Sequence, residues 1–169
     1  MNVESTTLSG VKSITPPTNF EDFRGSYVEI YNRDLYREAG ITVDFLQDDI
    51  STSTRHVLRG IHGDQETWKL ISCLSGKFYL LVVDMDPDSP TYRKWEGFTL
   101  SDSNRRQVLI PPKHGNGHVV LSDTAIFHYK QNTHYNRAGQ FTILWNDPEF
   151  DFWWPIKAPI LSRRDEGLE

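Results

Sequence analysis

Short strand-forming runs separated by turn residues recur along this chain, and this pattern constrains the fold more than any other feature. Runs rich in β-branched and aromatic residues are typical of strands, and clusters of Gly, Pro, Asn, Asp and Ser are typical of turns. Strands are expected at residues 26–31, 41–47, 70–74, 77–84, 95–100, 107–110, 118–121, 125–131 and 140–145. The runs 70–74 and 77–84 are expected to form a hairpin across Ser75-Gly76.

Helical signals are nearly absent. Only residues 32–40 predict a helix, which is short and ends at Gly40. Residues 1–18 are polar, end in Pro16-Pro17 and predict at most a short edge strand, whereas 84–90 and 111–117 predict loops. Many short strands with almost no helix indicate an all-β sandwich or barrel. A length of 169 residues favours a single domain, 1–169.

Composition excludes several classes of protein. The formal net charge of −5 argues against a nucleic-acid partner, although a few Arg and Lys side chains can still bind a phosphate locally. The single cysteine, Cys73, forms no intrachain disulfide and lies in an apolar run, which predicts a buried structural thiol. The start lacks the features of a signal peptide, and no apolar run approaches the roughly 18–20 residues that span a membrane. We therefore expect a cytoplasmic protein without a membrane partner.

The segment 59–70 carries potential catalytic side chains and leads directly into a predicted strand. His62 is a potential general base, Lys69 supplies an ammonium seven residues later, and Gly60 and Gly63 permit unusual backbone angles beside the histidine. A charged, flexible segment that enters a regular strand is typical of side chains that act on a rigid scaffold.

Strand parity predicts which polar groups point inwards. Lys69 shares a face with Ile71 and Cys73, and Tyr129 shares a face with Phe127. If those faces line a barrel, a Lys and a Tyr point into an otherwise apolar cavity, where buried polar tips require a partner or a task.

A series of short motifs follows in one order along the chain. They are Arg24-Gly25, Phe45-Leu46-Gln47-Asp48, Val57-Leu58-Arg59-Gly60-Ile61-His62, Lys69-Leu70, Asp88-Ser89-Pro90-Thr91, Lys94-Trp95, Leu109-Ile110-Pro111-Pro112, Tyr129-Lys130, Trp145-Asn146-Asp147 and Leu161-Ser162-Arg163-Arg164-Asp165. In register, from about residue 10 to residue 165, they resemble the dTDP-4-dehydrorhamnose 3,5-epimerase family. The run from Arg59 to Asp64, with Gly115-Asn116-Gly117-His118, is similar to the branch that acts on GDP-4-keto-heptoses of bacterial capsules.

The resemblance implies a cupin-type jelly roll with one or two short helices that forms a homodimer, partly by exchanging N-terminal strands. It implies an isomerase, independent of metal and cofactor, that inverts C3 and/or C5 of a nucleotide-diphospho-4-keto-(6-deoxy)sugar or heptose for capsule or lipopolysaccharide biosynthesis. The ketone at C4 acidifies the hydrogens on C3 and C5, so a base can form an enolate and a proton can return from the opposite face. A positive group near the developing oxyanion completes the requirement.

In the family's scheme His62 is the base and Asp165 fixes its tautomer, Lys69 stabilises the enolate, and Tyr129 supplies the opposing proton. Arg59 binds near the diphosphate, and Arg24 and Glu29 serve the nucleotide end, across the dimer. The full set of substrate-binding residues that the resemblance implies is Arg59, Arg24, Glu29, Gln47, Asn116 and His118.

Three departures from the family's pattern keep other functions open. Asn116 stands where most of the family has His, Asp49-Ile50 replaces Asn-His, and Gly63-Asp64 replaces an aromatic-Gln pair. The alternatives are a 3,4-ketoisomerase of a similar sugar nucleotide and a non-catalytic sugar-nucleotide-binding jelly roll. A metal site is not expected, because no two His stand two apart on a strand.

Overall fold

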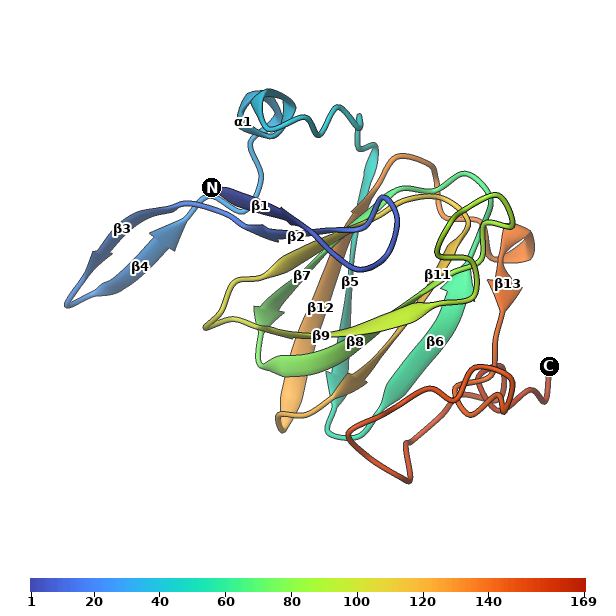
Figure 1. The fold of residues 1–169 in the computed structure, drawn as a ribbon. Helices are drawn as coiled ribbons and strands as arrows, with labels where there is room; N and C mark the ends of the chain where they lie inside the picture. Colours follow the sequence, from blue (N-terminus) through green and yellow to red (C-terminus); the bar gives the residue numbers. More distant parts are fainter.

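Two antiparallel sheets pack face to face in the computed structural model, which describes residues 1–169 (Figure 1). The six-stranded sheet has the order β1-β2-β10-β7-β12-β5 and the five-stranded sheet the order β13-β6-β11-β8-β9. The strands are β1 (Asn2–Ser5), β2 (Lys12–Thr15), β3 (Thr18–Asp22), β4 (Gly25–Val28), β5 (Gln47–Thr54), β6 (Leu58–Gly63), β7 (Lys69–Ser75), β8 (Lys77–Asp84), β9 (Trp95–Ser101), β10 (Gln107–Ile110), β11 (His114–Val120), β12 (Thr124–Gln131) and β13 (Phe141–Thr142). The predicted all-β jelly roll is therefore confirmed.

The main core lies between the sheets. Ile71 and Phe127 from the six-stranded sheet meet Phe78 and Leu80 from the five-stranded one, and all four are buried. The thiol of Cys73 lies in the same cluster, where burial raises its pKa to about 11, so the predicted structural thiol is confirmed.

Both outer faces of the sandwich are covered as well. The C-terminal tail packs over the five-stranded sheet, where Trp154 is buried with Tyr79 and Leu81, while Trp153 remains 58% exposed. On the other side, Tyr36 and Ile41 pack on Leu70 of the six-stranded sheet. Central strands that are buried on both faces follow from this arrangement, and β8 is buried at every position after Lys77.

The predicted hairpin between residues 70–74 and 77–84 is wrong. β7 pairs with β10 and β12, whereas β8 pairs with β11 and β9, so the two strands lie in different sheets. Gly76 takes a φ of +78° at the point where the chain crosses over. Because both strands carry apolar residues on both faces, they pack across the core rather than side by side.

Several other boundaries differ from expectation. Residues 41–46 are not a strand, because they run as an irregular segment over the six-stranded sheet, and the strand β5 begins only at Gln47. The first 18 residues hold both β1 and β2, which pair with each other, and β2 also pairs with β10. β11 begins at His114, inside the predicted 111–117 loop, because that run pairs with β8.

The one α-helix, α1 (Arg33–Glu38), matches the prediction. The side chain of Asn32 caps it by accepting from the backbone N–H groups of Asp34 and Leu35, and Gly40 follows with a φ of +83°. A short 3₁₀ turn, η1 (Arg137–Gly139), precedes β13. No helix has the length and apolar character needed to traverse a lipid bilayer.

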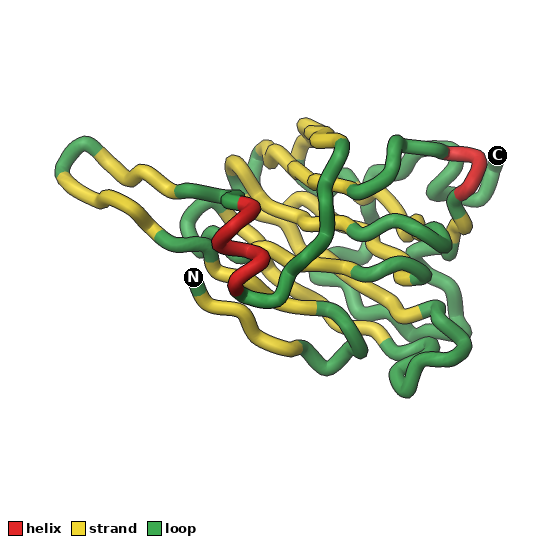
Figure 2. Tube along the Cα trace, turned by 90° about the horizontal axis from the view of Figure 1, so that it is seen from above, coloured by secondary structure: helices red, strands yellow, loops and turns green.

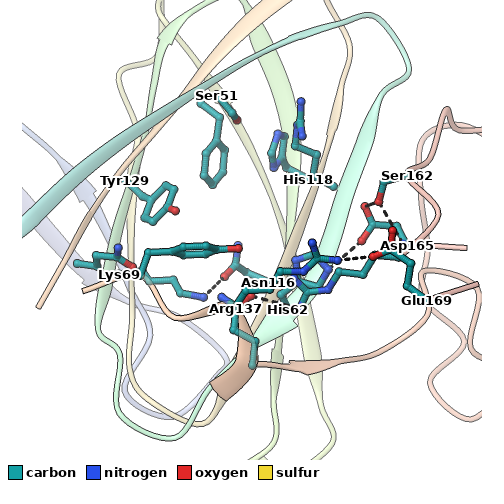
Figure 3. A pocket seen from close by; sticks show the side chains of 16 residues that line it. Ser51, His62, Lys69, Asn116, His118, Tyr129, Arg137, Ser162, Asp165 and Glu169 are labelled. Atoms are coloured by element: carbon teal, nitrogen blue, oxygen red, sulfur yellow. Dashed lines mark hydrogen bonds and ion pairs between the residues drawn. The ribbon is translucent and has the colours of Figure 1, made fainter. Parts of the chain in front are cut away.

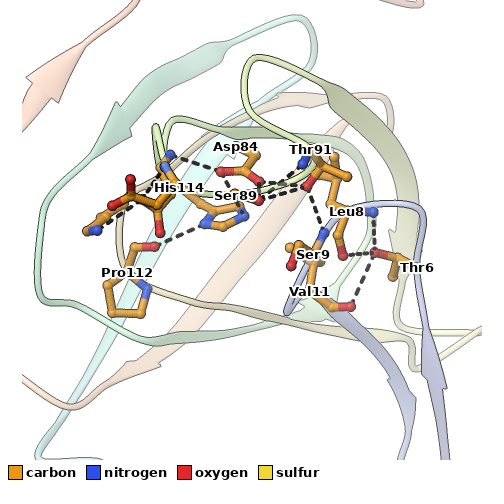
Figure 4. Close-up of polar contacts among 12 residues, drawn as sticks. Thr6, Leu8, Ser9, Val11, Asp84, Ser89, Thr91, Pro112 and His114 are labelled. Carbon is orange, nitrogen blue, oxygen red and sulfur yellow. Dashed lines mark hydrogen bonds and ion pairs between the residues drawn. The ribbon is translucent and has the colours of Figure 1, made fainter.

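A buried polar cluster holds the start of β11 in place (Figure 4). Asp84, with no exposed surface, accepts hydrogen bonds from the Ser89 and Thr91 hydroxyls at 2.5 and 2.6 Å, and Thr91 in turn accepts from the backbone N–H of Ser9 at 2.9 Å. His114 Nε2 lies 3.6 Å from Asp84 Oδ1. The cluster ties the N-terminal segment and the 84–91 loop to the strand that carries Asn116.

The β3–β4 hairpin extends away from both sheets (Figures 1 and 2). It carries large exposed apolar side chains, with Phe23 98% and Phe20 71% exposed. Its ordered contacts with the body include a hydrogen bond from Arg105 to Thr18 Oγ1 at 2.8 Å.

Candidate active site

A pocket of about 390 Å³ opens at one end of the sandwich (Figure 3). Its lining is Ser51, Arg59, His62, Lys69, Asn116, His118, Phe127, Tyr129, Gln131, Tyr135, Arg137, Gln140, Ser162, Arg164, Asp165 and Glu169. The structure therefore gathers all four predicted catalytic residues in one cavity, together with Arg59, Asn116 and His118. The expectation of an otherwise apolar cavity is wrong, because β6, β11 and the tail contribute a polar wall opposite Phe127 and Tyr129.

His62 and Asp165 form a close pair at this polar wall. His62 Nε2 lies 2.8 Å from Asp165 Oδ1, and the Ser162 hydroxyl donates to Asp165 Oδ2 at 2.8 Å. Burial alone would raise the pKa of the Asp165 carboxyl, but the contacts with His62 and Ser162 outweigh it and the pKa is lowered. Because a carboxylate only accepts, the ring proton of His62 belongs on Nε2, which leaves Nδ1 free to act as a base.

Glycine allows the backbone around His62 to approach β11. Gly60 has a φ of +112°, and a side chain there would lie 2.6 Å from the carbonyl oxygen of Asn116. At Gly63 a side chain would meet the His114 carbonyl oxygen and the ring of Phe141. The predicted importance of both glycines therefore has a steric origin, and their close approach makes His62 and Asn116 cross-strand partners.

Lys69 stands at the first position of β7 and is only 7% exposed. Its Nζ donates to Asn116 Oδ1 at 3.0 Å. Burial lowers the pKa of the ammonium to about 8, although the charge of Asp64 acts in the opposite direction. Lys69 therefore remains largely cationic at neutral pH.

Tyr129 lies on β12 in the six-stranded sheet, whereas His62 lies on β6 in the five-stranded sheet. Burial raises the pKa of Tyr129, and the nearby Asp49 and Tyr135 raise it further. The phenol is thus protonated near neutral pH, and it lines the same pocket from the wall opposite the base.

His118 forms part of the pocket lining, and its ring stacks on Phe127 with centroids 4.1 Å apart and planes 10° apart. Burial, followed by the positive charge of Arg59, lowers its pKa to about 3 against the opposing influence of Asp165. The imidazole is neutral at neutral pH, and its Nε2 has no partner in the protein.

The remaining predicted binding residues divide into two groups. Arg59 lines the pocket, and its Nε donates to Ser53 Oγ at 2.9 Å. Gln47 lies just outside it and accepts from the backbone N–H of Tyr135 at 3.0 Å. Arg24 and Glu29 are not in this pocket: Arg24 pairs with Asp22 on the β3–β4 hairpin, and Glu29 accepts from Asn32 at 3.1 Å.

Sequence reasoning missed part of the lining, including Tyr135, Arg137, Gln140 and Arg164. These residues lie on η1, the segments beside it and the tail, where no periodic pattern indicates which way a side chain points. Arg164 could have been found, because it immediately precedes Asp165. No group of three or more His, Cys, Asp or Glu side chains that could hold a metal ion occurs in the chain.

The fold and the pocket together define a jelly-roll protein in which a His–Asp pair, a buried Lys and a Tyr share one cavity. The sequence model of the dTDP-4-dehydrorhamnose 3,5-epimerase family matches residues 5–169, and the chain belongs to this family.

Known members of the family are similar to this chain over nearly its whole length. The dTDP-4-dehydrorhamnose 3,5-epimerase of Shigella flexneri is 41% identical over 169 residues, which cover 98% of this chain and 93% of that protein. The crystal structure of the Bacillus anthracis enzyme, with TDP and pyrophosphate bound, has a TM-score of 0.93 at 35% identity and covers 97% of this chain and 95% of that one. The Legionella pneumophila enzyme, in complex with dTDP-4-keto-L-rhamnose, has a TM-score of 0.92 at 36% identity, covering 98% and 90%.

Proposed function

We propose that this protein is an epimerase that inverts C3, C5 or both in a nucleotide-diphospho-4-keto sugar. The observation that carries the proposal is the placement of His62 and Tyr129 on opposite sheets of one pocket that also contains the ammonium of Lys69. Inversion at a carbon requires a base on one face and an acid on the other, which this arrangement can provide. Family membership and the substrates named for the relatives support the same substrate class.

The reaction follows from the geometry. Nδ1 of His62 takes a proton from the carbon beside the ketone, and the resulting imidazolium is stabilised by Asp165 at 2.8 Å. The electron pair moves into an enolate, whose oxygen is stabilised by Lys69. Tyr129 then donates its proton to the opposite face of the carbon. Solvent restores the phenol and removes the proton from His62, so the enzyme returns to its starting state.

Solvent exchange tests this function directly. We expect deuterium from heavy water to enter C3, C5 or both when the enzyme is incubated with a panel of GDP-, CDP- and dTDP-4-keto sugars, including 6-deoxyhexoses and heptoses, with positions read by NMR. His62→Asn should reduce the rate by orders of magnitude. The matched control is His56→Asn, because His56 is exposed and its φ of +68° suits Asn.

The same experiment separates the alternatives. A product in which the carbonyl has moved from C4 to C3 would identify a 3,4-ketoisomerase instead, and tight binding without exchange would identify a non-catalytic binding protein. Exchange in neither position with any sugar of the panel would refute the epimerase proposal. The configuration of the product at each labelled carbon, read by NMR, decides between one and two inverted centres, and the preferred sugar tests the heptose assignment.

The projecting hairpin supports a homodimer. Phe20, Phe23 and Tyr27 are large apolar side chains exposed on β3–β4, and contiguous exposed apolar surface is typical of an interface. A second copy that packs on this hairpin would also give Arg24 and Glu29 a route to a neighbouring pocket. We expect light scattering to give twice the mass of the 19.6 kDa chain, and Phe23→Asp to shift it toward the monomer. A monomeric wild-type protein would refute the dimer.

Two broader assignments complete the proposal. Residues 1–169 act as one domain, supported by β2 pairing with β10 and by the tail covering the five-stranded sheet. The enzyme works in the cytoplasm, where nucleotide-activated sugars for surface polysaccharides are made, without metal or cofactor. Fractionation of cells and full activity after exhaustive treatment with a chelator would test these two expectations.

A further inference from the structure

Asn116 lies between the proposed base and the proposed ammonium. Its backbone pairs with His62 on β6 and with Val82 on β8, in the middle of the five-stranded sheet. Its side chain crosses the pocket, and Oδ1 accepts the hydrogen bond from Lys69 Nζ at 3.0 Å (Figure 3). Asn116 is therefore linked to both groups, to His62 through the backbone and to Lys69 through its side chain.

The Lys69 ammonium depends on this contact. Lys69 is 7% exposed, and the Asn116 oxygen is the only protein acceptor within hydrogen-bond distance of Nζ. A buried cation without a partner is costly, so the amide both orients the ammonium and favours its charged form.

The other end of the amide is unused by the protein. The one side-chain hydrogen bond of Asn116 is the one that Oδ1 accepts, so Nδ2 donates to no protein atom, and Asn116 is only partly buried, within the pocket lining. Because Oδ1 is engaged by the ammonium, Nδ2 is the end of the amide that remains available to a substrate in the pocket that Asn116 lines. An amide in this orientation offers a fixed donor that neither gains nor loses a proton near neutral pH.

We propose that Asn116 and Lys69 act as one oxyanion-binding unit, in which Oδ1 holds the ammonium while Nδ2 donates to the substrate oxygen that becomes negative. The inference rests on the proposed epimerisation and assigns Asn116 two tasks in it. Donors of this kind contribute about 10²–10³-fold to kcat in other enzymes that stabilise an oxyanion.

Two substitutions of similar size separate these tasks. Asn116→Leu removes both the acceptor and the donor, so Lys69 loses its partner and its pKa falls below the wild-type value of about 8. Asn116→Asp keeps an oxygen beside the ammonium and adds a negative charge, so the pKa of Lys69 rises, but the donor is lost. Among the other charged and titratable groups, Asp64 acts on the ammonium. The same pocket is also lined by Arg59, His62, His118, Tyr129, Tyr135, Arg137, Arg164, Asp165 and Glu169. All of these groups are unchanged in both variants.

The proposal predicts how the exchange rate depends on pH in the wild type and in the two variants. Lys69 must be charged to stabilise the enolate, so the exchange rate should fall as pH rises through about 8 in the wild type. The midpoint of this alkaline fall should move down in Asn116→Leu and up in Asn116→Asp, while kcat at the optimum falls at least about tenfold in both variants because the donor is missing. A purely structural role for Asn116 would lower the rate at all pH values without moving the midpoint in opposite directions.

NMR titration of the Lys69 side chain in the ligand-free protein gives a second readout. The protein is labelled with ¹⁵N/¹³C-lysine, the signal is assigned with Lys69→Arg, and thermal denaturation shows that each variant is folded. The matched control is Asn146→Asp, which adds the same charge at an exposed position outside the pocket and should leave the pKa of Lys69 unchanged.

These experiments distinguish a failure of the Asn116–Lys69 proposal from a failure of the proposed epimerase function. Absence of exchange in the wild type refutes the epimerase proposal, whereas the titration still reports whether Asn116 controls the charge of Lys69. Exchange in the wild type with an unchanged Lys69 pKa in both Asn116 variants refutes the unit proposed here. Opposite shifts with an unchanged kcat at the optimum refute the donor role of Nδ2.

Discussion

Removing the charge of Asp165 tests the proposed base most directly. In Asp165→Asn the side chain keeps its size and its place beside the Ser162 hydroxyl, but the 2.8 Å contact with His62 Nε2 loses its carboxylate. A hydrogen bond to a charged group contributes about 1.5–3 kcal/mol. At about 1.36 kcal/mol per factor of ten, this loss alone lowers kcat about 10- to 150-fold.

The substitution also lowers kcat by changing the tautomer of His62. The amide of Asn can present its N–H groups to His62 Nε2, which then accepts and leaves the proton on Nδ1, the atom that must act as the base. In the serine proteases the corresponding substitution lowers kcat about 10⁴-fold for this reason. We therefore expect a fall of about 10²- to 10⁴-fold in kcat with little change in KM, because Asp165 acts on the base rather than on the substrate.

The assay is the initial rate of deuterium entry from heavy water near neutral pH, with thermal denaturation to show that the variant is folded. Glu166→Gln is the matched control, because it removes the neighbouring carboxylate at an exposed position. A folded Asp165→Asn protein with kcat within about threefold of the wild type would show that Asp165 does not support His62 as the base.

Three further predictions follow from the pocket. Tyr129→Phe should lose the proton donor on the opposite face, so NMR should detect deuterium exchange with almost no inverted product; inversion at the wild-type rate would exclude Tyr129 as the acid. The pKa of buried His118 is about 3 in the folded protein and 6.5 for an exposed imidazole, so the free energy of unfolding should fall as pH drops from 6.5 toward 3. Urea unfolding should show that His118→Phe removes this dependence of stability on pH. An unchanged dependence would contradict the buried, neutral imidazole. Gly63→Ala should cost at least about 1–3 kcal/mol in thermal or urea unfolding, because the added methyl meets the His114 carbonyl, and wild-type stability would contradict the steric account.

The strands that could be predicted are those whose side chains carry a clear pattern. β10 lies at the predicted residues, and β9 and β12 differ from the prediction by one residue at one end. β5 was missed because its sequence, QDDISTST, is polar and largely exposed at alternate positions, so it lacks an apolar face. The pairing of β7 and β8 could not be read from sequence, because a turn at Ser75-Gly76 looks the same whether it joins two strands of one sheet or crosses between two sheets.

The residues of the candidate site also divide into those that the sequence could place and those that it could not. Lys69 and Tyr129 could be placed because parity determines the face to which each side chain points. His62 is expected in a flexible segment, but the structure places it on the strand β6. Asp165 was reached only through the family resemblance, since its position beside His62 depends on how the tail folds back. Arg24 and Glu29 lie outside the pocket of this chain, and no pattern within a single sequence reveals a contribution from a second copy.

The pairing of His62 with Asp165 joins two residues that lie far apart in the sequence. A ribosome makes the imidazole long before it makes the carboxylate, so an unfinished chain carries a pocket whose base is unsupported. Full activity therefore requires that translation has reached residue 165 and that the tail has folded back so that Asp165 contacts His62.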